Sequence, residues 1–376
     1  MDMIQLPRIA VGTVQRSADM QVMTWALMNV LERSGVHVQL FSPQSRFATR
    51  DAALRITGQS RRHLDSWLMT PETCIELFSR GTRFADIGLV EGQYDVARQA
   101  FRGGGSLDTL CQWLDLPSLV TIDARLLDAG HPLPLPSGAV GLLLDNVADV
   151  AELCRLQTEF EALCGIPVLG WLDRLTQLRA VVSDLLPDDD PTPELCHALG
   201  DALAPCLRLE QLLQIASQRP FSEAQCQLFR HRCLARPLRV AVAFDNAFNC
   251  YFPDALDALE SQGATVSVFS PLQGDCLPGE PDVVYLGSGR PEEYLDRLAA
   301  NCCIKESLWN HVISGGRIYA ESAGLAYLCR EIVMPGGDHW PMVGLLPALA
   351  RRNPSPAADR PVEITVAKDS WLFSRN

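Results

Sequence analysis

Short apolar runs and amphipathic stretches alternate along the first 170 residues. Runs with the length and composition of buried strands lie at 8–13, 36–41, 87–90, 118–123, 139–145 and 166–170. Helical periodicity at about 20–34 and 149–163 separates some of these runs. Strands that alternate with helices predict a parallel sheet, and therefore an α/β domain.

The strand pattern stops between about 176 and 236. A proline-broken polar loop at 186–193 is followed by helical segments at 194–217 and by a polar connector. A second series then begins, with predicted strands at 238–244, 265–269, 283–286 and 318–320 and helices near 254–261 and 291–313. We therefore predict a first domain over 1–217, a linker over 218–237 and a second α/β domain over 238–376.

One stretch near the end of the second series predicts a specific local geometry. The strand that ends at Ala320 runs into small residues and then into a helical pattern from Leu325. This strand, sharp turn and helix lift Ser322 above the sheet edge. The N–H groups of Ala323 and Gly324, with the loop of Gly287, Ser288 and Gly289, are candidates for an oxyanion hole.

Charge and composition exclude several classes of function. The net charge of -13 argues against a surface that binds nucleic-acid phosphates, and Lys305 and Lys368 are the only lysines. No run approaches the ~18 apolar residues of a membrane span, and the N-terminus lacks the layout of a signal peptide. We predict a cytoplasmic protein without nucleic-acid or membrane partners.

The thirteen cysteines are scattered and include no Cys-x-x-Cys pair. Several lie at apolar helical positions, namely Cys154, Cys164, Cys196 and Cys206. We therefore expect reduced cysteines that serve as small core residues, and no metal site.

Several motifs occur in an order that resembles the cobyrinic acid a,c-diamide synthase family. The most specific are the segments at 240–253, 269–272, 285–292, 319–325 and 341–347; weaker ones lie at 62–69, 90–92, 121–124 and 165–170. The resemblance implies a P-loop-type, dethiobiotin-synthetase-like domain followed by a class I glutamine amidotransferase-like, flavodoxin-like domain. It also implies an enzyme that uses ATP and glutamine to convert tetrapyrrole carboxylates to amides.

The candidate phosphate loop departs from what phosphate binding requires. Gly12, Thr13, Arg16 and Ser17 follow the first strand, without a second glycine and without lysine, and Asp19 would repel phosphate. Arg16 is the one candidate to replace the lysine, but its guanidinium is bulkier. We therefore expect that neither ATP nor magnesium binds here.

Other candidate ligand-binding residues are acidic or basic. Glu91 and Asp123 follow strand ends, where they either bind metal or, as we expect, accept hydrogen bonds from loop N–H groups. The family motifs also single out Asp65. Arg61, Arg62 and Arg290 are candidates to pair with tetrapyrrole carboxylates.

The resemblance places a cysteine nucleophile at the position of Ser322, and its activating histidine beyond a segment that corresponds to 369–373. The sequence ends at Asn376, and His339, in a predicted surface turn, is the one histidine after Ser322. The chain is thus expected to be a C-terminally shortened member without a glutaminase nucleophile or base.

These features favour a pseudoenzyme: a non-catalytic paralogue that binds a tetrapyrrole, or that pairs with an active amide synthase. Its expected partners are a second copy or such an enzyme. The alternative is an active ATP-dependent amide synthase that uses free ammonia or groups supplied by a partner. A chain without any selected role is the third possibility.

Overall fold

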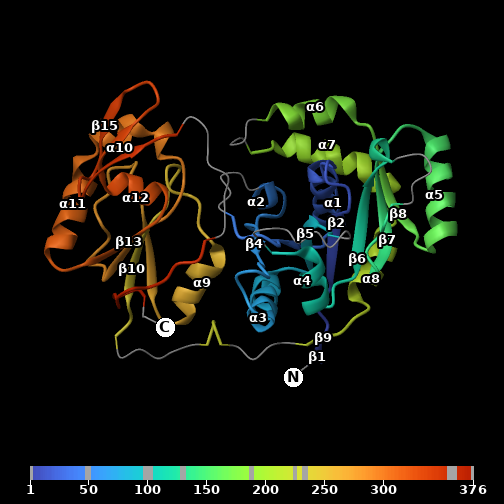
Figure 1. The fold of residues 1–376 in the computed structure, drawn as a ribbon, viewed down its shortest axis with the longest axis horizontal. Helices are drawn as coiled ribbons and strands as arrows, with labels where there is room; N and C mark the ends of the chain where they lie inside the picture. The colour runs from blue at the N-terminus through green and yellow to red at the C-terminus, as the bar shows by residue number, and fades with distance from the viewer. Residues whose placement is uncertain are drawn as a thin grey trace.

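The computed structural model describes residues 3–46, 52–95, 105–127, 133–185, 190–222, 227–230, 236–353 and 362–373. Two α/β domains follow each other along the chain (Figure 1). The predicted fold class is confirmed, because each domain is built on a parallel sheet. Among the described residues, no helix is both long and apolar enough to cross a membrane.

The N-terminal domain contains a seven-stranded sheet whose paired strands are all parallel, in the order β4-β3-β5-β2-β6-β7-β8. Its strands are β2 (Arg8–Thr13), β3 (Val38–Ser42), β4 (Arg62–His63), β5 (Ile87–Gln93), β6 (Ser118–Asp123), β7 (Ala139–Val147) and β8 (Val168–Asp173). Since both faces of the sheet are covered by helices, the central strands read as continuous apolar runs.

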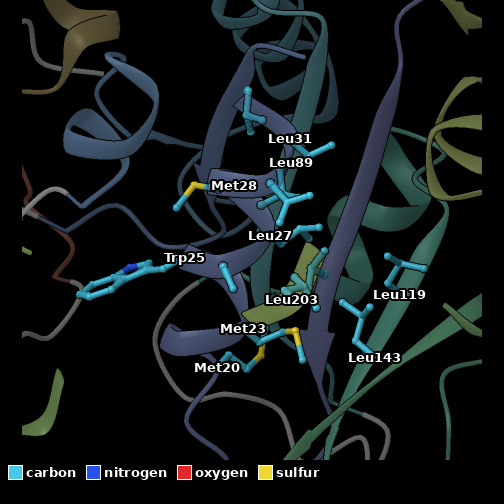
Figure 2. Packing of buried hydrophobic residues seen from close by; sticks show 14 of the residues in the cluster. Met20, Met23, Trp25, Leu27, Met28, Leu31, Leu89, Leu119, Leu143 and Leu203 are labelled. Atoms are coloured by element: carbon cyan, nitrogen blue, oxygen red, sulfur yellow. The ribbon is translucent and has the colours of Figure 1, made fainter. Parts of the chain in front are cut away.

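One face of this sheet packs against a helix that is buried along nearly its whole length, α1 (Gln21–Arg33). Figure 2 shows its methionine and leucine side chains among residues of the sheet and of α7. The same face is covered by α2 (Ala52–Thr57), α6 (Thr176–Asp184), α7 (Pro193–Leu203) and α8 (Leu209–Ser217), and the opposite face by α3 (Pro71–Gly81), α4 (Leu107–Trp113) and α5 (Val150–Cys164). Short 3₁₀ turns are η1 (Thr82–Phe84), η2 (Ala124–Leu126) and η3 (Ala204–Cys206).

The C-terminal domain contains a parallel sheet in the order β11-β10-β12-β13 and a small mixed sheet in the order β15-β14-β16. Their strands are β10 (Arg239–Ala243), β11 (Thr265–Phe269), β12 (Val283–Leu286), β13 (Arg317–Ala320), β14 (Cys329–Val333), β15 (His339–Pro341) and β16 (Leu346–Arg351). The helices are α9 (Pro253–Ser261) on one face of the parallel sheet, and α10 (Leu295–Ala300), α11 (Cys302–Ile313) and α12 (Ala323–Leu328) on the other.

The described residues of the predicted linker contact both domains. Arg236 pairs with Asp282 and the Leu228 carbonyl accepts a hydrogen bond from Gln262, both in the C-terminal domain, and other contacts are with the N-terminal domain. β9 (Phe221–Ser222) pairs antiparallel with β1 (Met3–Ile4). The buried Arg8 guanidinium donates hydrogen bonds to the carbonyls of residues 219 and 220. Glu76 accepts hydrogen bonds from the N–H groups of residues 227–229. The predicted domain bounds themselves stay a prediction.

Two local predictions were wrong. The helix expected near 291–313 is divided into η4 (Pro291–Glu293), α10 and α11, because Asn301 leaves the helical conformation and donates its amide to the Pro271 carbonyl. His339 lies in β15, where it pairs with β14, and not in a turn. Helical spacing alone could not anticipate the contact between Asn301 and the Pro271 carbonyl.

The cysteine prediction also needs correction. Cys276 and Cys303 form a disulfide between the loop after β11 and the first turn of α11. Cys196 is buried as expected, but Cys154 and Cys164 are exposed on α5. Their helical positions face solvent because other residues of α5 contact the sheet.

Candidate functional site

The loop between β2 and α1 is fastened to the end of β6 by a glutamine. The Gln15 side chain donates to the Asp123 carbonyl at 3.1 Å and accepts from the Asp123 N–H at 2.8 Å. The Gln15 N–H donates to the Thr13 hydroxyl at 3.1 Å. Gly12 has no room for a side chain, since a Cβ there would lie 2.6 Å from the Tyr94 ring. The loop is therefore held by its own side chains.

The N-terminus of α1 is already occupied by an acid of the chain. Asp19 Oδ1 accepts a hydrogen bond from the Gln21 N–H at 2.9 Å. A carboxylate is favourable at this position, because the helix dipole places partial positive charge there. An incoming phosphate would have to displace this carboxylate from the N–H group and then remain beside its negative charge.

Two of the predicted acids sit near this loop, held by different partners. Glu91 accepts a hydrogen bond from the Thr24 hydroxyl of α1 at 2.9 Å, and its other oxygen lies 3.6 Å from the Arg61 guanidinium. We expected a loop N–H group in this role. Asp123 is 2% exposed and accepts from the Arg125 N–H and guanidinium and from the Asn146 amide. Both carboxylates thus have partners within the chain.

A third acid near Asp123 was not anticipated. Asp145 ends the predicted strand 139–145, is 1% exposed and pairs with the Arg179 guanidinium. Burial raises the pKa of Asp145 to about 6, although Arg179 opposes this shift. Among the described residues, no group of three or more His, Cys, Asp or Glu side chains could hold a metal ion.

A cavity of about 740 Å³ opens over the carboxyl ends of β2, β3 and β5. Asp19, Glu91, Arg46 and Arg61 contribute its charged walls. Crevices at the carboxyl ends of parallel strands are the usual ligand sites of open α/β sheets. The cavity therefore has the position of a ligand site in this fold.

Asp65 has a structural role in the loop after β4. Its two carboxylate oxygens accept hydrogen bonds from the N–H groups of Ser45, Trp67 and Leu68, at 2.9, 3.0 and 3.3 Å. The carboxylate is buried with 3% exposure. The Asp65 carboxylate thus connects the segments after β3 and β4, and both of its oxygens are engaged by backbone N–H groups.

The predicted ligand arginines also pair with acids of the chain. Arg62 forms ion pairs with Asp254 and Asp257 in the first turns of α9, which joins the two domains. Arg290 pairs with Glu293 at 2.7 Å. A ligand carboxylate would have to compete with these partners.

The sharp turn in the C-terminal domain has the predicted form. Ser322 lies between β13 and α12 with φ 47° and ψ −112°, a conformation that costs a residue other than glycine about 1–3 kcal/mol. Its side chain is exposed. Gly324 is required for close packing, because a Cβ there would lie 2.2 Å from the Leu286 carbonyl oxygen.

The residue before Ser322 is held by two tyrosines. The Tyr285 hydroxyl donates to Glu321 at 2.5 Å, and the Tyr319 hydroxyl donates to the other Glu321 oxygen at 3.3 Å. Tyr251 continues the row of rings, with its centroid 5.1 Å from that of Tyr285. This row fixes the strand ends beneath the turn.

The predicted oxyanion hole is only partly available. The Gly324 N–H donates to the carbonyls of Gly287 and Glu321, each at 2.9 Å, and the Gly287 N–H donates to the Tyr251 hydroxyl at 3.0 Å. Within the described ranges, the N–H groups of Gly289 and Ala323 have no such acceptor. Gly289 and Ala323 border a cavity of about 280 Å³, together with Ser322 and Ala326.

No base activates Ser322 in the described part of the chain. His339 is exposed, and its Nδ1 lies 2.6 Å from a Glu331 oxygen. His311 contacts the Arg317 carbonyl at 3.0 Å. Among the described residues, none hydrogen-bonds to the Ser322 hydroxyl.

Comparison with known proteins identifies relatives along most of the chain. Residues 239–359 match the model of the CobB/CobQ-like glutamine amidotransferase domain. A cobyrinate a,c-diamide synthase of Syntrophotalea carbinolica is 30% identical over 364 residues, which covers 92% of this chain and 78% of that protein. Proteins of the same name from Priestia megaterium and Magnetococcus marinus are 26% and 27% identical, covering 97% and 94% of this chain and 82% and 79% of their own.

Proposed function

The chain belongs to the cobyrinate a,c-diamide synthase family, and we propose that it is a non-catalytic member of that family. In this proposal it binds a tetrapyrrole carboxylate without amidating it. The names of its relatives give cobyrinate a,c-diamide as the molecule that they make. The cavity of about 740 Å³ at the carboxyl ends of the sheet, with Arg46 and Arg61 in its wall, is the proposed ligand site.

One observation carries the non-catalytic part of the proposal. The Asp19 carboxylate occupies the Gln21 N–H at the start of α1, where a phosphate would need to bind. The sequence has no lysine before Lys305 that could neutralise phosphate charge in this domain. The serine at position 322, without a hydrogen-bonded base among the described residues, supports the same conclusion for glutamine hydrolysis.

Calorimetric titration tests the ligand part. Mg-ATP and cobyrinic acid would be titrated separately into the purified chain. We expect binding of cobyrinic acid in the absence of nucleotide, and no heat change with Mg-ATP up to millimolar concentration. Micromolar affinity for ATP would overturn the interpretation of the loop and favour an active synthase.

A matched pair of variants tests the glutaminase half. Ser322→Cys supplies the thiol, and Ser322→Ala is its control. We expect neither to release ammonia from glutamine above the background of the unmodified chain, since the base is missing as well as the thiol. Ammonia release by Ser322→Cys alone would mean that the serine is the one defect of this site.

A further inference from the structure

A second cavity, of about 320 Å³, lies between the two domains. Leu54, Arg61 and His63 line it from the N-terminal domain, and Phe244 and Tyr251 from the C-terminal domain. In Figure 1 the elements on its border, β4, α2 and α9, face each other where the domains meet. None of the functions considered above uses this cavity.

His63 gives the cavity a polar group that has no partner in the protein. The residue is 9% exposed, and its Nδ1 atom is buried without a hydrogen-bond partner. The edge of the Phe252 ring lies against the imidazole, with the ring centroids 5.2 Å apart. The other ring nitrogen, Nε2, is not fully buried and has no hydrogen-bond partner among the described residues. A ligand in the cavity would therefore hydrogen-bond to Nε2, the nitrogen that it can reach.

The charge state of His63 restricts what can bind. Burial, and after it the nearby Arg61 guanidinium, lower the pKa of His63 to about 4. The imidazole is therefore neutral at physiological pH, and it can donate or accept only one hydrogen bond at each nitrogen. An uncharged polar group of the ligand, such as a ring N–H or a carbonyl, fits the accessible Nε2 atom.

The walls of the cavity specify the rest of the ligand. Leu54 and Phe244 come from opposite domains and are 46% and 51% exposed, although both are large apolar residues. A flat apolar body would cover both. Arg46 and Arg61 line this cavity as well as the larger cavity over the sheet, and thus offer cationic groups at the boundary between the two.

We propose that this interdomain cavity binds a heteroaromatic carboxylate, whose ring packs between Leu54 and Phe244 and whose uncharged polar group hydrogen-bonds to His63. Its carboxylate lies toward Arg46 or Arg61. Because its walls come from both domains, the ligand also holds the domains together. The site does not depend on whether the phosphate loop binds nucleotide.

Such chemistry has two sources: a free single-ring carboxylate, or one pyrrole edge of a larger macrocycle that extends from the neighbouring cavity. Calorimetric titrations with indole-3-acetate and with coproporphyrin distinguish them. Indole-3-acetate offers a ring N–H and one carboxylate in a size suited to the smaller cavity, whereas coproporphyrin requires both cavities.

His63→Leu is the decisive variant, and His37→Leu is its matched control, because His37 is an exposed histidine that lines neither cavity. We expect at least tenfold weaker binding of the accepted probe by His63→Leu, and unchanged binding by His37→Leu. Dependence on His63 for indole-3-acetate assigns a free ligand, and dependence for coproporphyrin alone assigns the macrocycle edge. Equal affinity in all three proteins, or binding of neither probe, overturns the proposal.

Phe244→Ala provides a test if His63→Leu does not fold. It removes one exposed apolar wall, and we expect it to weaken the accepted probe at least fivefold. An unchanged affinity would also overturn the proposal. Binding of ATP would refute the non-catalytic function proposed above and leave this result untouched, so the two failures are distinguishable.

Discussion

The buried His63 predicts a measurable dependence of stability on pH. In the folded chain its pKa is about 4, lowered from 6.5 by burial and by Arg61, with a smaller opposing effect of Asp65. Above pH 6.5 the imidazole is neutral in both the folded and the unfolded chain, so it adds no pH dependence there. As the pH falls from 6.5 to about 4, the unfolded chain takes up a proton that the folded chain does not, and stability is lost.

The size of this loss follows from the two pKa values. At about 1.4 kcal/mol per pKa unit, the loss in the free energy of unfolding reaches about 2 kcal/mol at pH 5 and about 3 kcal/mol at pH 4. Replacement by a residue that cannot ionise removes this contribution. We therefore expect His63→Leu to gain about 2 kcal/mol relative to the unmodified chain between pH 7.5 and pH 5.

Urea unfolding followed by tryptophan fluorescence, at pH 7.5, 6 and 5, measures this difference. Other titrating groups cancel in the comparison, because both proteins contain them. One is Asp145, whose raised pKa of about 6 makes stability rise as the pH falls through that value. His37→Leu, which removes an exposed histidine, is the control. Parallel pH curves for His63→Leu and the unmodified chain would refute the reasoning, since they require an imidazole that titrates normally when folded.

Three further substitutions test other contacts. Arg62→Met should cost about 2 kcal/mol in thermal or urea unfolding, because it removes the Arg62 cation from the half-buried Asp254 carboxylate. Arg33→Met, at an exposed ion pair, should cost under about 1 kcal/mol, and equal losses would contradict an interdomain role. Ser322→Gly should raise the melting temperature by relieving about 1 kcal/mol of backbone strain, and a fall would mean that the hydroxyl makes stabilising contacts. Arg8→Met should cost about 3 kcal/mol, measured by urea unfolding, because several buried carbonyls lose their donor; an unchanged midpoint would mean that water replaces it.

The sequence by itself determined the elements and the fold class. Strand β11, predicted at 265–269, has those bounds in the structure, as does β12 at 283–286. The sharp turn at Ser322 was also predicted, down to the side chain that it exposes. These features depend on the period of apolar residues and on small residues at a turn, which act over a few neighbouring positions.

The prediction that the loop after β2 binds phosphate poorly rests on residue types alone. The absence of lysine and the acid at position 19 are properties of the sequence. Its geometric consequence, the Asp19 carboxylate on the Gln21 N–H, needed the helix to form. The partners of Glu91 were not predictable, because Thr24 and Arg61 reach it from two other segments of the chain.

Only the tertiary structure decided how the two domains use their charged and polar groups. Arg62 was a candidate for ligand binding, but it pairs with Asp254, which is 192 positions away. His63, next to it in sequence, gave no signal of its own; it gains its low pKa and its unpartnered nitrogen from burial at the domain boundary. Such properties depend on which surfaces meet after folding, and a local pattern of residues carries no information about the segment that will lie opposite.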